Sequence, residues 1–436
     1  MKLFNLTLKY SGFPIKEARK KLKEIKAIPN AEYEEFVMRE REAIVRYHAE
    51  NNPYYNKLIN NRRNLPWEEI PVLTKADLQH PLQERLSNGY TSKNSYVNRT
   101  SGSSGHPFIF AKDKWCHALT WAEIMDRFGW FGIDFNHSLQ ARFYGIPLGG
   151  FGYRKERLKD LLSSRYRFPI FDLSEEKMAQ FLQHFRQKKF CYINGYTSAI
   201  VLFAKYLRKQ NILLIEICPT LKHCVVTSEM LFETDKQLME QVFGVPVINE
   251  YGASELDLIA FTNPEGEFVV NSETLFVEVL DKNNRAVPNG TSGRIVITSL
   301  FNKAHPLIRY DIGDTGSFTE MSTFKKPAFK TLIGRTNDVA KLKNGKNVPG
   351  LTFYYVTKNV IEDDGNVKEF VIEQLAIDAF KITYVSEEKL SITEENKIKK
   401  SLYKYLEDDL ELTFNRVEIL ERGNRGKLKQ FVSKLK

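Results

Sequence analysis

The sequence of 436 residues predicts an α/β protein with a large N-terminal domain and a small α+β C-terminal domain. The large domain is expected to hold mixed, mostly parallel sheets and an antiparallel β portion. Three observations predict this organisation: a length greater than one hydrophobic core usually supports, alternating helix and strand patterns between about residues 107 and 300, and short strands with turn signals after residue 265.

The first 95 residues are expected to form a helical lead-in. Apolar residues recur at helical spacing in EEFVMREREAIVRYHAE, residues 34–50. In IPVLTKADL, residues 70–78, Thr74 and Asp77 have the spacing of a capping box, which predicts the start of a helix.

The middle of the chain alternates between helix and strand patterns. Such alternation predicts βαβ units with parallel strands. The later segments EGEFVV, LFVEVLD and GRIVITSL are separated by turn residues and predict antiparallel strands. In the alternating region, strands are expected near residues 139–144, 168–172, 190–193, 223–228 and 246–249, and helices near 114–130, 174–188, 197–209 and 230–243.

A domain boundary is expected in the glycine-rich, basic segment 333–350. We place the large domain at 1–335 and the small domain at 336–436, because the last hundred residues carry the pattern of a separate unit. That pattern predicts strands near 369–373, 379–385 and 415–420 and a helix over 394–408.

Composition and charge exclude several classes of protein. The 64 lysine and arginine residues exceed the 54 aspartate and glutamate residues, and the net charge of +10 suits either polyanionic ligands or a solvated basic surface. No basic block alternates with aromatic residues as in nucleic-acid modules, so no nucleic-acid partner is expected. The longest apolar runs are far shorter than the roughly 20 residues of a membrane span, and the N-terminus has no apolar signal core. We expect a cytoplasmic protein without a transmembrane segment.

The four cysteines do not form a disulfide framework, and none lies in a CxxC pair. Cys218, His223 and Cys224 could be regarded as one corner of a zinc site. However, the ligands at 223 and 224 would be adjacent, and no second cluster follows. A metal site is therefore not expected there.

RTSGSSGHPFIF, residues 99–110, is the first segment that suggests chemistry. Small hydroxylated residues and glycines let backbone N–H groups approach an anion, so Thr100 to Gly105 could bind phosphate oxygens. The alternative is a flexible surface turn. No GxxxxGK[ST] or GxSxG spacing is present here, which excludes a Walker A loop and a nucleophile elbow.

INEYGASELDLI, residues 248–259, places an aromatic residue, a glycine and a carboxylate after an apolar strand. Tyr251 could stack on a base, and Glu255 could bind Mg²⁺, which takes one or two carboxylates together with phosphate oxygens. A strand that leaves the sheet edge through a turn explains the segment equally well.

Three later segments contain charged residues near glycines. HPLIRYDIGDTGSF holds Asp311 and Asp314, and carboxylates near strand ends commonly accept hydrogen bonds from ribose hydroxyls. IGRTND supplies Arg335, and GNRGKLKQF supplies Lys427, for which a solvated basic tail is the alternative.

The order of these segments is more specific than any one of them. The series TSGSSGHP, NEYGASE, RYDIGDTG, IGRTND and RGK resembles the adenylate-forming (acyl-CoA synthetase and luciferase-like) superfamily. It is most similar to the phenylacetate-CoA ligase branch, with its CapK-like members of capsular polysaccharide biosynthesis. The resemblance extends over nearly the whole chain, from IPVLTKADL to GKLKQF.

The resemblance implies a role for each matching residue. Thr100 and the residues 101–105 match the loop that covers the β and γ phosphates of ATP, and Glu255 matches the Mg²⁺ ligand. Lys427 matches the C-terminal lysine that contacts the acyl carboxylate and the α phosphate, and Arg335 matches the helper of the ribose-binding carboxylate. The implied nucleotide-binding residues are Thr100, Ser101, Gly102, Ser103, Ser104, Gly105, Ser228, Glu229, Tyr251, Gly252, Ala253, Ser254 and Asp314.

The resemblance also implies a mobile C-terminal domain and an acyl pocket. The hinge position is Asn337, where many relatives have Asp. Phe108 stands where many superfamily members have a lysine, and the phenylacetate ligase branch often lacks that lysine too. Residues 256–300 contain no cysteine, so the zinc site of some ligases of the branch is not expected. The expected pocket residues are Phe143, Tyr144, Gly145 and Tyr196.

The resemblance implies a ligase that uses ATP and Mg²⁺ to convert a small-molecule carboxylic acid to an acyl adenylate. The acyl group is then expected to pass to a thiol, most simply coenzyme A. Transfer to a carrier protein, or to an amine or hydroxyl in capsule or surface polysaccharide, is an alternative. A non-catalytic nucleotide-binding scaffold is an alternative of another class.

Overall fold

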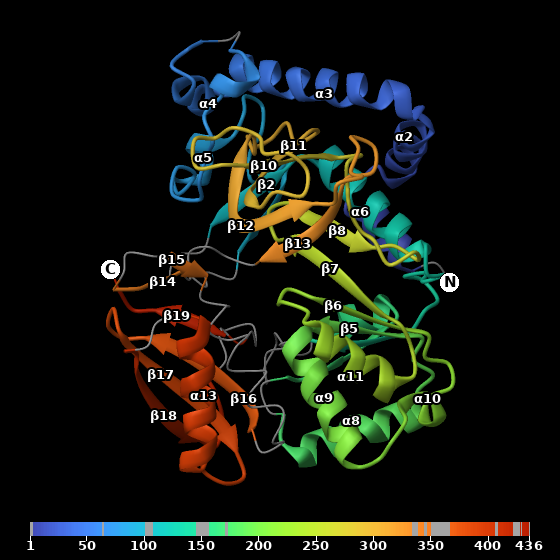
Figure 1. Cartoon of the computed structure of the whole chain (residues 1–436). Helices are drawn as coiled ribbons and strands as arrows, with labels where there is room; N and C mark the ends of the chain where they lie inside the picture. Colours follow the sequence, from blue (N-terminus) through green and yellow to red (C-terminus); the bar gives the residue numbers. More distant parts are fainter. Residues whose placement is uncertain are drawn as a thin grey trace. The chain divides into compact units, whose positions relative to one another are not determined.

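The structure, a computed structural model, describes residues 3–62, 65–100, 108–144, 157–170, 173–333, 339–343, 347–349, 367–405, 409–421, 428 and 430–435. The chain divides into two units, Met1–Leu332 and Ile333–Lys436 (Figure 1). The boundary that the sequence predicts, between residues 335 and 336, falls outside the described residues.

Helices dominate the beginning of the large unit. The second helix is amphipathic, and its buried Ala18 and Leu22 pack against Ala118, Leu119 and Ala122 of a later helix. This contact attaches the lead-in to the sheet-containing part of the unit. The elements of this region are α1 (Leu3–Tyr10), α2 (Ile15–Ala27), α3 (Asn30–Asn51), α4 (Pro53–Leu58), the 3-10 helix η1 (Trp67–Glu69) and α5 (Leu82–Arg85).

The capping-box prediction at Thr74 is corrected in one respect. The expected contacts form, because Thr74 N and Thr74 Oγ1 both donate to Asp77 Oδ2, at 2.8 and 2.7 Å. They enclose a turn and not a helix, and the next helix, α5, begins at Leu82. Pro81 explains the difference, because a proline cannot donate to a helical carbonyl and its ring clashes with the carbonyl four residues earlier.

One sheet of eleven strands runs through the large unit, in the order β10-β11-β12-β13-β9-β8-β7-β6-β5-β3-β4. A separate two-stranded sheet is formed by β1 (Tyr96–Arg99) and β2 (Ile109–Lys112). The strands of the large sheet are β3 (Gln140–Phe143), β4 (Arg165–Phe168), β5 (Tyr192–Tyr196), β6 (His223–Thr227), β7 (Val247–Ala253), β8 (Asp257–Thr262), β9 (Phe268–Val270), β10 (Leu275–Leu280), β11 (Gly293–Ser299), β12 (Tyr310–Phe318) and β13 (Ala328–Ile333).

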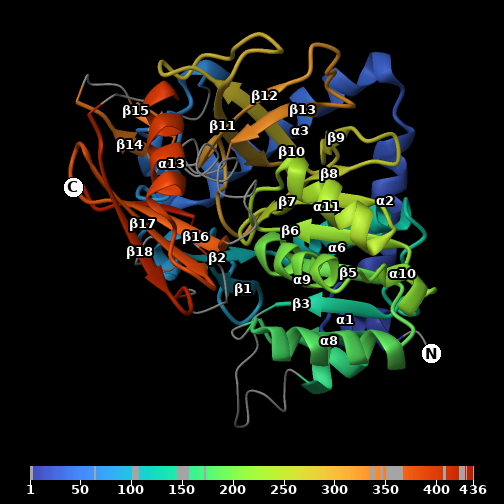
Figure 2. The same cartoon turned by 60° about the horizontal axis from the view of Figure 1, so that its bottom comes forward.

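The predicted α/β class is confirmed at one end of this sheet, where β4, β3, β5, β6 and β7 are parallel neighbours. Apolar residues of four helices, α8 to α11, cover one face of these strands, and α6 lies against the other face (Figure 2). This is the layered arrangement that buries both faces of parallel strands. The helices between the strands are α6 (Lys114–Gly129), α8 (Glu175–Gln187), α9 (Thr197–Lys209), α10 (Leu214–Ile217) and α11 (Glu233–Phe243).

The predicted boundaries differ from the observed ones at β4, and by as much at β18 (Glu411–Val417), which was expected near 415–420. Strand β4 was expected near residues 168–172, but it spans Arg165–Phe168. Its arginines at 165 and 167 carry no apolar signal, whereas the later residues Pro169 and Ile170 do. The strand forms there because its register with β3 places Phe168 beside Phe143, with ring centroids 4.8 Å apart.

The remaining strands of the large sheet form the antiparallel portion that the sequence predicts after residue 265. Their inward side chains pack with Phe110 of β2, with Phe108 just before that strand, and with residues of α3 and α4 in one apolar core. Three of these strands, β8, β12 and β13, were not individually expected. Strand β12 carries the glycines and aspartates of RYDIGDTG, a composition typical of turns and not of strands.

The second unit has its own core and its own four-stranded sheet, of order β18-β17-β16-β19. Ile398 and Leu402 of its helix pack against Phe370, Ile372 and Ile382 of the sheet. The elements are β14 (Val339–Lys341), β15 (Asn347–Pro349), β16 (Val367–Gln374), β17 (Ala379–Ser386), α13 (Ile392–Tyr405), β18 (Glu411–Val417) and β19 (Phe431–Ser433).

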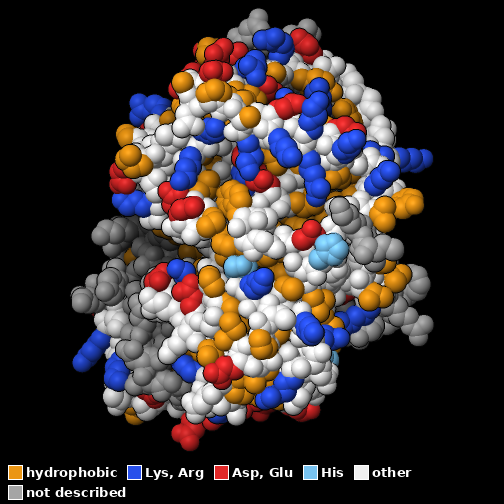
Figure 3. All heavy atoms as spheres, turned by 90° about the vertical axis from the view of Figure 1, so that its right-hand side faces the viewer, with side chains coloured by type: hydrophobic (Ala, Val, Ile, Leu, Met, Phe, Trp, Pro, Cys, Tyr) orange, Lys and Arg blue, Asp and Glu red, His pale blue; other side chains and the backbone are white. Residues whose placement is uncertain are grey.

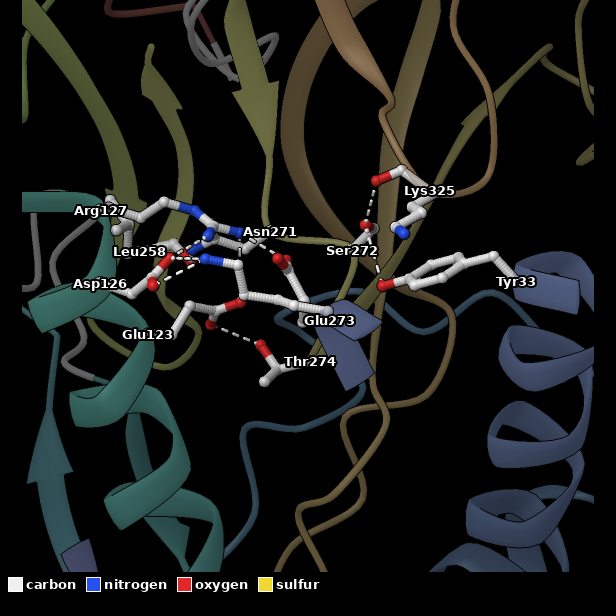
Figure 4. Close-up of polar contacts among 11 residues, drawn as sticks. Tyr33, Glu123, Asp126, Arg127, Leu258, Asn271, Ser272, Glu273, Thr274 and Lys325 are labelled. Atoms are coloured by element: carbon white, nitrogen blue, oxygen red, sulfur yellow. Dashed lines mark hydrogen bonds and ion pairs between the residues drawn. The ribbon is translucent and has the colours of Figure 1, made fainter. Parts of the chain in front are cut away.

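A buried polar cluster joins α6 to the segment between β9 and β10 (Figure 4). Arg127, which is 2% exposed, donates from Nε to Asn271 Oδ1 at 2.8 Å and forms an ion pair with Glu273. Thr274 Oγ1 donates to Glu123 Oε2 at 2.7 Å. Burial, reinforced by the negative charge of Glu273, raises the pKa of Glu123 well above its usual range. The cluster therefore places one guanidinium against the carboxyl groups of Glu273 and Glu123, and burial favours the protonated form of Glu123.

Candidate functional site

The turn between β7 and β8 presents the residues of NEYGASE. Tyr251 and Gly252 flank an irregularity in the pairing of the two strands, and Leu256 N donates to Ala253 O at 3.1 Å to close the turn. Gly252 is required by close approach, since a Cβ atom built on it would lie 2.4 Å from the carbonyl oxygen of Asp257. Ala253, which pairs with Asp257, is followed by Ser254 and Glu255 at the tip.

Tyr251 connects this turn to β12. Its hydroxyl donates to Asp314 Oδ2 at 2.6 Å, and its ring packs edge-on against Phe329 with centroids 6.1 Å apart. Asp314 is 8% exposed. The two residues assigned by resemblance to adenine and ribose are thus hydrogen-bonded to each other although they lie 63 positions apart.

Glu255 is held by the same strand. Its side chain is 6% exposed, and its Oε1 accepts a hydrogen bond from Tyr310 at 2.9 Å. Asp311, the other aspartate of this motif, instead forms an ion pair with Arg294, with the atoms Nη1 and Oδ2 2.5 Å apart. Of the two aspartates in RYDIGDTG, Asp314 is the one that faces the turn of Tyr251.

The predicted phosphate loop connects β1 to β2, which pair as antiparallel strands. Thr100 follows β1, and its backbone N donates to Phe108 O at 2.9 Å. In return, Phe108 N donates to the hydroxyl of Thr100 at 3.0 Å. Both residues are buried, so the two ends of the loop are fixed to the protein. Residues 101–107 lie outside the described residues.

The segment Thr227–Glu229, which holds the implied nucleotide-binding residues Ser228 and Glu229, leaves β6 with an unusual backbone. Ser228 has a φ of +70°, in the left-handed region that a residue with a Cβ rarely adopts. Glu229 accepts a hydrogen bond at Oε2 from the backbone N of Ser198, 2.7 Å away in the first turn of α9. The carboxylate thereby satisfies a free N–H group of the helix and anchors the segment.

Of the expected pocket residues, Tyr144 and Tyr196 lie together at the ends of β3 and β5, with ring centroids 4.6 Å apart. Phe143 has no exposed surface and packs among Phe168, Phe181 and Phe203 on the helix-covered face. Because side chains alternate between the two faces along a strand, Phe143 points to the face opposite Tyr144 and Tyr196. This position favours a packing role for Phe143 over the expected pocket wall.

Five predictions fall outside the described residues: the loop Ser101–Gly105, Gly145, Arg335, Asn337 and Lys427. Within the part of the chain that the structure describes, no group of three or more His, Cys, Asp and Glu side chains could hold a metal ion. The carboxylate of Glu255 is of the donor type that Mg²⁺ accepts, because this ion commonly takes one carboxylate and completes its coordination with phosphate oxygens and water.

Three residues of this region were not singled out from the sequence. Tyr310 orients Glu255, and Thr227 Oγ1 donates to Glu250 Oε1 at 2.9 Å. Glu250 and Tyr310 each lie inside a quoted motif, and a carboxylate between an apolar strand and an aromatic residue was a usable signal. Thr227 carried no comparable signal, because its partner is on another strand.

Lys and Arg side chains are dispersed among acidic and apolar ones on the face drawn in Figure 3. No helix in the described ranges is both long enough and apolar enough to cross a membrane.

No family model matches the chain. Among curated proteins, it is similar to Protein CapK of Staphylococcus aureus, with 23% identity over 331 residues, covering 71% of this chain and 68% of that protein. A phenylacetate-coenzyme A ligase of Thermus thermophilus is 24% identical over 348 residues, covering 74% of this chain and 75% of that protein. A phenylacetate-coenzyme A ligase of Aromatoleum evansii is 24% identical over 338 residues, covering 72% and 73%.

Solved structures show the same fold. A 2-hydroxyisobutyryl-CoA ligase in the postadenylation state matches with a TM-score of 0.71 and 17% identity, over 94% of this chain and 92% of that one. The amide bond synthetase McbA of Marinactinospora thermotolerans matches with a TM-score of 0.53 and 14% identity, over 77% and 68%. The chain is therefore similar in sequence to CapK and to phenylacetate-coenzyme A ligases, and it shares the fold of a solved CoA ligase.

Proposed function

We propose that the protein is an acid–thiol ligase that converts a carboxylic acid and ATP to an acyl adenylate and then to a thioester of coenzyme A. In the first step a carboxylate oxygen attacks the α phosphorus, and the bond from that phosphorus to the bridging oxygen breaks, releasing pyrophosphate. In the second step the thiol sulfur attacks the acyl carbon, AMP leaves, and the thiol proton passes to solvent.

The observation that carries this proposal is the convergence of two hydrogen-bonded pairs at β12. Tyr251 with Asp314, and Glu255 with Tyr310, bring an aromatic ring and two carboxylates from the β7–β8 turn and β12 into one region. An aromatic face can stack on a base, and a carboxylate can accept hydrogen bonds from ribose hydroxyls. The pairs hold these groups in place before any ligand binds, which is what electrostatic catalysis requires.

Glu255 would hold Mg²⁺ in this reaction, with Tyr310 fixing one of its oxygens. When bound, Mg²⁺ supplies positive charge to the phosphate oxygens as negative charge develops on them. The other roles remain those that the resemblance implies: Ser101–Gly105 for the outer phosphates, Arg335 as the helper of the ribose-binding Asp314, and Lys427 for the acyl carboxylate and the α phosphate.

Coenzyme A is the proposed acceptor because two of the sequence relatives are named phenylacetate-coenzyme A ligases and the matched solved structure is a CoA ligase. The CapK-like resemblance supports the alternative, transfer to an amine or hydroxyl of surface polysaccharide. An acceptor assay separates them, since a CoA thioester forms without any added sugar or amine.

Pyrophosphate release with ATP, Mg²⁺ and a panel of aryl, fatty, hydroxy and amino acids tests the first step. The Glu255→Gln variant keeps the size of the side chain and its contact with Tyr310 but loses the charge, so we expect release to fall at least about 100-fold. Glu265→Gln, at an exposed carboxylate of the β8–β9 turn, should match the unsubstituted protein.

The same assay with and without coenzyme A tests the second step. A rise in turnover and a new thioester are the expected results. ATP binding without pyrophosphate release from any acid would instead favour the non-catalytic scaffold, and equal release by Glu255→Gln would contradict the role of that carboxylate.

A further inference from the structure

Four side chains lie in one row across the carboxyl ends of four parallel strands. Thr227 of β6 lies beside Tyr196 of β5 on one side and beside Glu250 of β7 on the other. Phe143 of β3 lies beside Gly195 of β5, so the next residue, Tyr144, is level with Tyr196. Residues registered side by side in parallel strands share a face of the sheet. We name Tyr144, Tyr196, Thr227 and Glu250 the strand-end row. Ligands of such sheets bind outside the carboxyl ends of the strands.

The charged member of the strand-end row is Glu250, a half-buried carboxylate. Burial raises its pKa, and the hydrogen bond from Thr227 and the positive charge of Arg142 oppose that effect. Within the described part of the chain, Thr227 is the hydrogen-bond donor to Glu250. An ionised carboxylate offers about four acceptor sites, so a single neutral donor leaves most of its capacity for another group.

Arg142 does not neutralise this carboxylate by direct contact. Its guanidinium lies over the ring of Tyr144, with 4.0 Å between its central carbon and the ring centroid, and its Nη1 donates to Gln140 Oε1 at 3.3 Å. No ion pair within 4.0 Å joins Arg142 to Glu250 among the described residues. The guanidinium is therefore held against the aromatic part of the strand-end row.

Glu250 is adjacent in sequence to Tyr251, but strand alternation directs the two side chains to opposite faces of β7. Glu250 is therefore outside the hydrogen-bonded pairs proposed to serve the nucleotide. A purely apolar acyl group placed at this row would remove water from the carboxylate without replacing its hydrogen bonds, which is unfavourable. An acyl group that carries an N–H or O–H donor would replace them.

We infer that Glu250 is a specificity-determining residue and that the acid activated by this protein carries an ammonium or hydroxyl group that donates to its carboxylate. This rests on the proposed function, because it names the substrate class of that reaction. The aromatic pair of Tyr144 and Tyr196 contacts the carbon skeleton, and Thr227 orients Glu250 through its hydrogen bond.

Matched pairs of acids test the inference in the unsubstituted protein. The probes are 4-hydroxyphenylacetate with phenylacetate, 3-hydroxybutyrate with butyrate, and 4-aminobutyrate with pentanoate. In at least one pair, we expect kcat/KM for pyrophosphate release to be at least about tenfold higher for the acid with the donor, since a site built to hydrogen-bond a group discriminates strongly against its absence. Equal values in all three pairs would overturn the inference while leaving the proposed function intact.

Glu250→Gln then separates the two donors. The amide loses the negative charge but keeps a carbonyl acceptor, so a preference for the ammonium acid should disappear, whereas a preference for a hydroxy acid should fall by a smaller factor. Glu265→Gln is the matched control and should retain every ratio. If Glu250→Gln keeps the full preference and changes only thermal stability, the Thr227–Glu250 pair is structural and the inference is wrong.

Failure of the proposed function gives a different result. In that case no acid in the panel releases pyrophosphate from ATP, even at millimolar concentration, and both conclusions are overturned together.

Discussion

Tyr251 makes both an apolar contact and a hydrogen bond in the candidate site. Its ring contacts Phe329 in the antiparallel core, and its hydroxyl donates to Asp314 at 2.6 Å. A hydrogen bond to a charged acceptor is worth more than one between neutral groups, and it restricts the rotamers of the carboxylate. Tyr251 therefore positions Asp314 in addition to offering a stacking surface.

We predict that Tyr251→Phe raises the KM for ATP about tenfold, since a hydrogen bond to a charged group contributes roughly 1.5–3 kcal/mol. The kcat should change little, because the ring and Glu255 remain. Initial rates of pyrophosphate release at varied ATP concentration measure both constants. Tyr10→Phe, at a tyrosine that is 88% exposed, is the control. A large fall in kcat with an unchanged KM would contradict the positioning role.

Three buried histidines should make the free energy of unfolding depend on pH. Burial lowers the pKa of His48 and of His117 to about 4, and burial together with the charge of Arg85 lowers the pKa of His305 well below its ordinary value. The folded protein therefore binds fewer protons than the unfolded chain, whose histidines titrate near 6.5. Stability should be complete above about pH 6.5 and should fall as the pH drops towards 4, by about 1.4 kcal/mol per pH unit for each histidine.

Urea unfolding at pH 7.5, 6.0 and 5.0 measures this loss. His48 donates from Nε2 to Asn302 O at 2.8 Å in its neutral form, so His48→Gln can keep a hydrogen bond and should reduce the pH dependence. The exposed His137, as His137→Gln, should leave the pH dependence unchanged. Stability that is flat between pH 7.5 and 5.0 would show that these histidines are not buried in solution.

At the scale of elements, the β7–β8 turn is the part of the site with the least room for change. The turn reverses the chain between Ala253 and Asp257 and places Glu255 against Tyr310. Its geometry depends on Gly252, whose missing side chain lets the strand approach the Asp257 carbonyl.

We predict that Gly252→Ala lowers the free energy of unfolding by at least about 2 kcal/mol, because backbone atoms must move to admit the methyl group. It should also reduce acid-dependent pyrophosphate release even where the protein remains folded, since the same movement displaces Glu255. Gly129→Ala is the matched control, because a Cβ atom there meets nothing within 4 Å. Equal stability of the two variants, measured by thermal unfolding, would refute the close approach.

At the scale of the whole molecule, the polar cluster of Figure 4 connects three parts of the large unit that are distant in the sequence: α3, α6 and the segment before β10. Arg127 of α6 contacts Asn271 and Glu273, which precede β10. The hydroxyl oxygen of Tyr33, on α3, lies 3.3 Å from Ser272 Oγ. Because these groups are buried, each is stabilised mainly by the others.

We predict that Arg127→Met destabilises the protein by about 3–5 kcal/mol, since it leaves buried carboxylates without their cation. Glu123→Gln should have a much smaller effect, because burial raises the pKa of Glu123 and so favours its uncharged form, and the amide oxygen can still accept from Thr274 Oγ1. Arg39→Met, at an arginine whose side chain is 63% exposed, is the control. Chemical denaturation of the three variants gives the comparison, and comparable losses for Glu123→Gln and Arg127→Met would contradict a protonated Glu123.

The sequence by itself determined the type and order of most elements. Apolar periodicity predicted α9 at the residues where the helix lies, and the succession of strands and helices predicted the parallel end of the sheet. The order of the motifs TSGSSGHP, NEYGASE and RYDIGDTG predicted the family. Helix and strand patterns and short motifs are local features, because each depends only on the spacing of residues that are close together in the sequence.

Tertiary structure decided which of the motif residues meet. It joined Tyr251 to Asp314 and Glu255 to Tyr310 across strands that are separated in the sequence, and it sent Phe143 into the core while Tyr144 stayed beside Tyr196. It also made a strand of RYDIGDTG, whose composition favours a turn. Such contacts depend on strand order and register, which are set by the packing of the whole sheet and leave no trace in the spacing of adjacent residues.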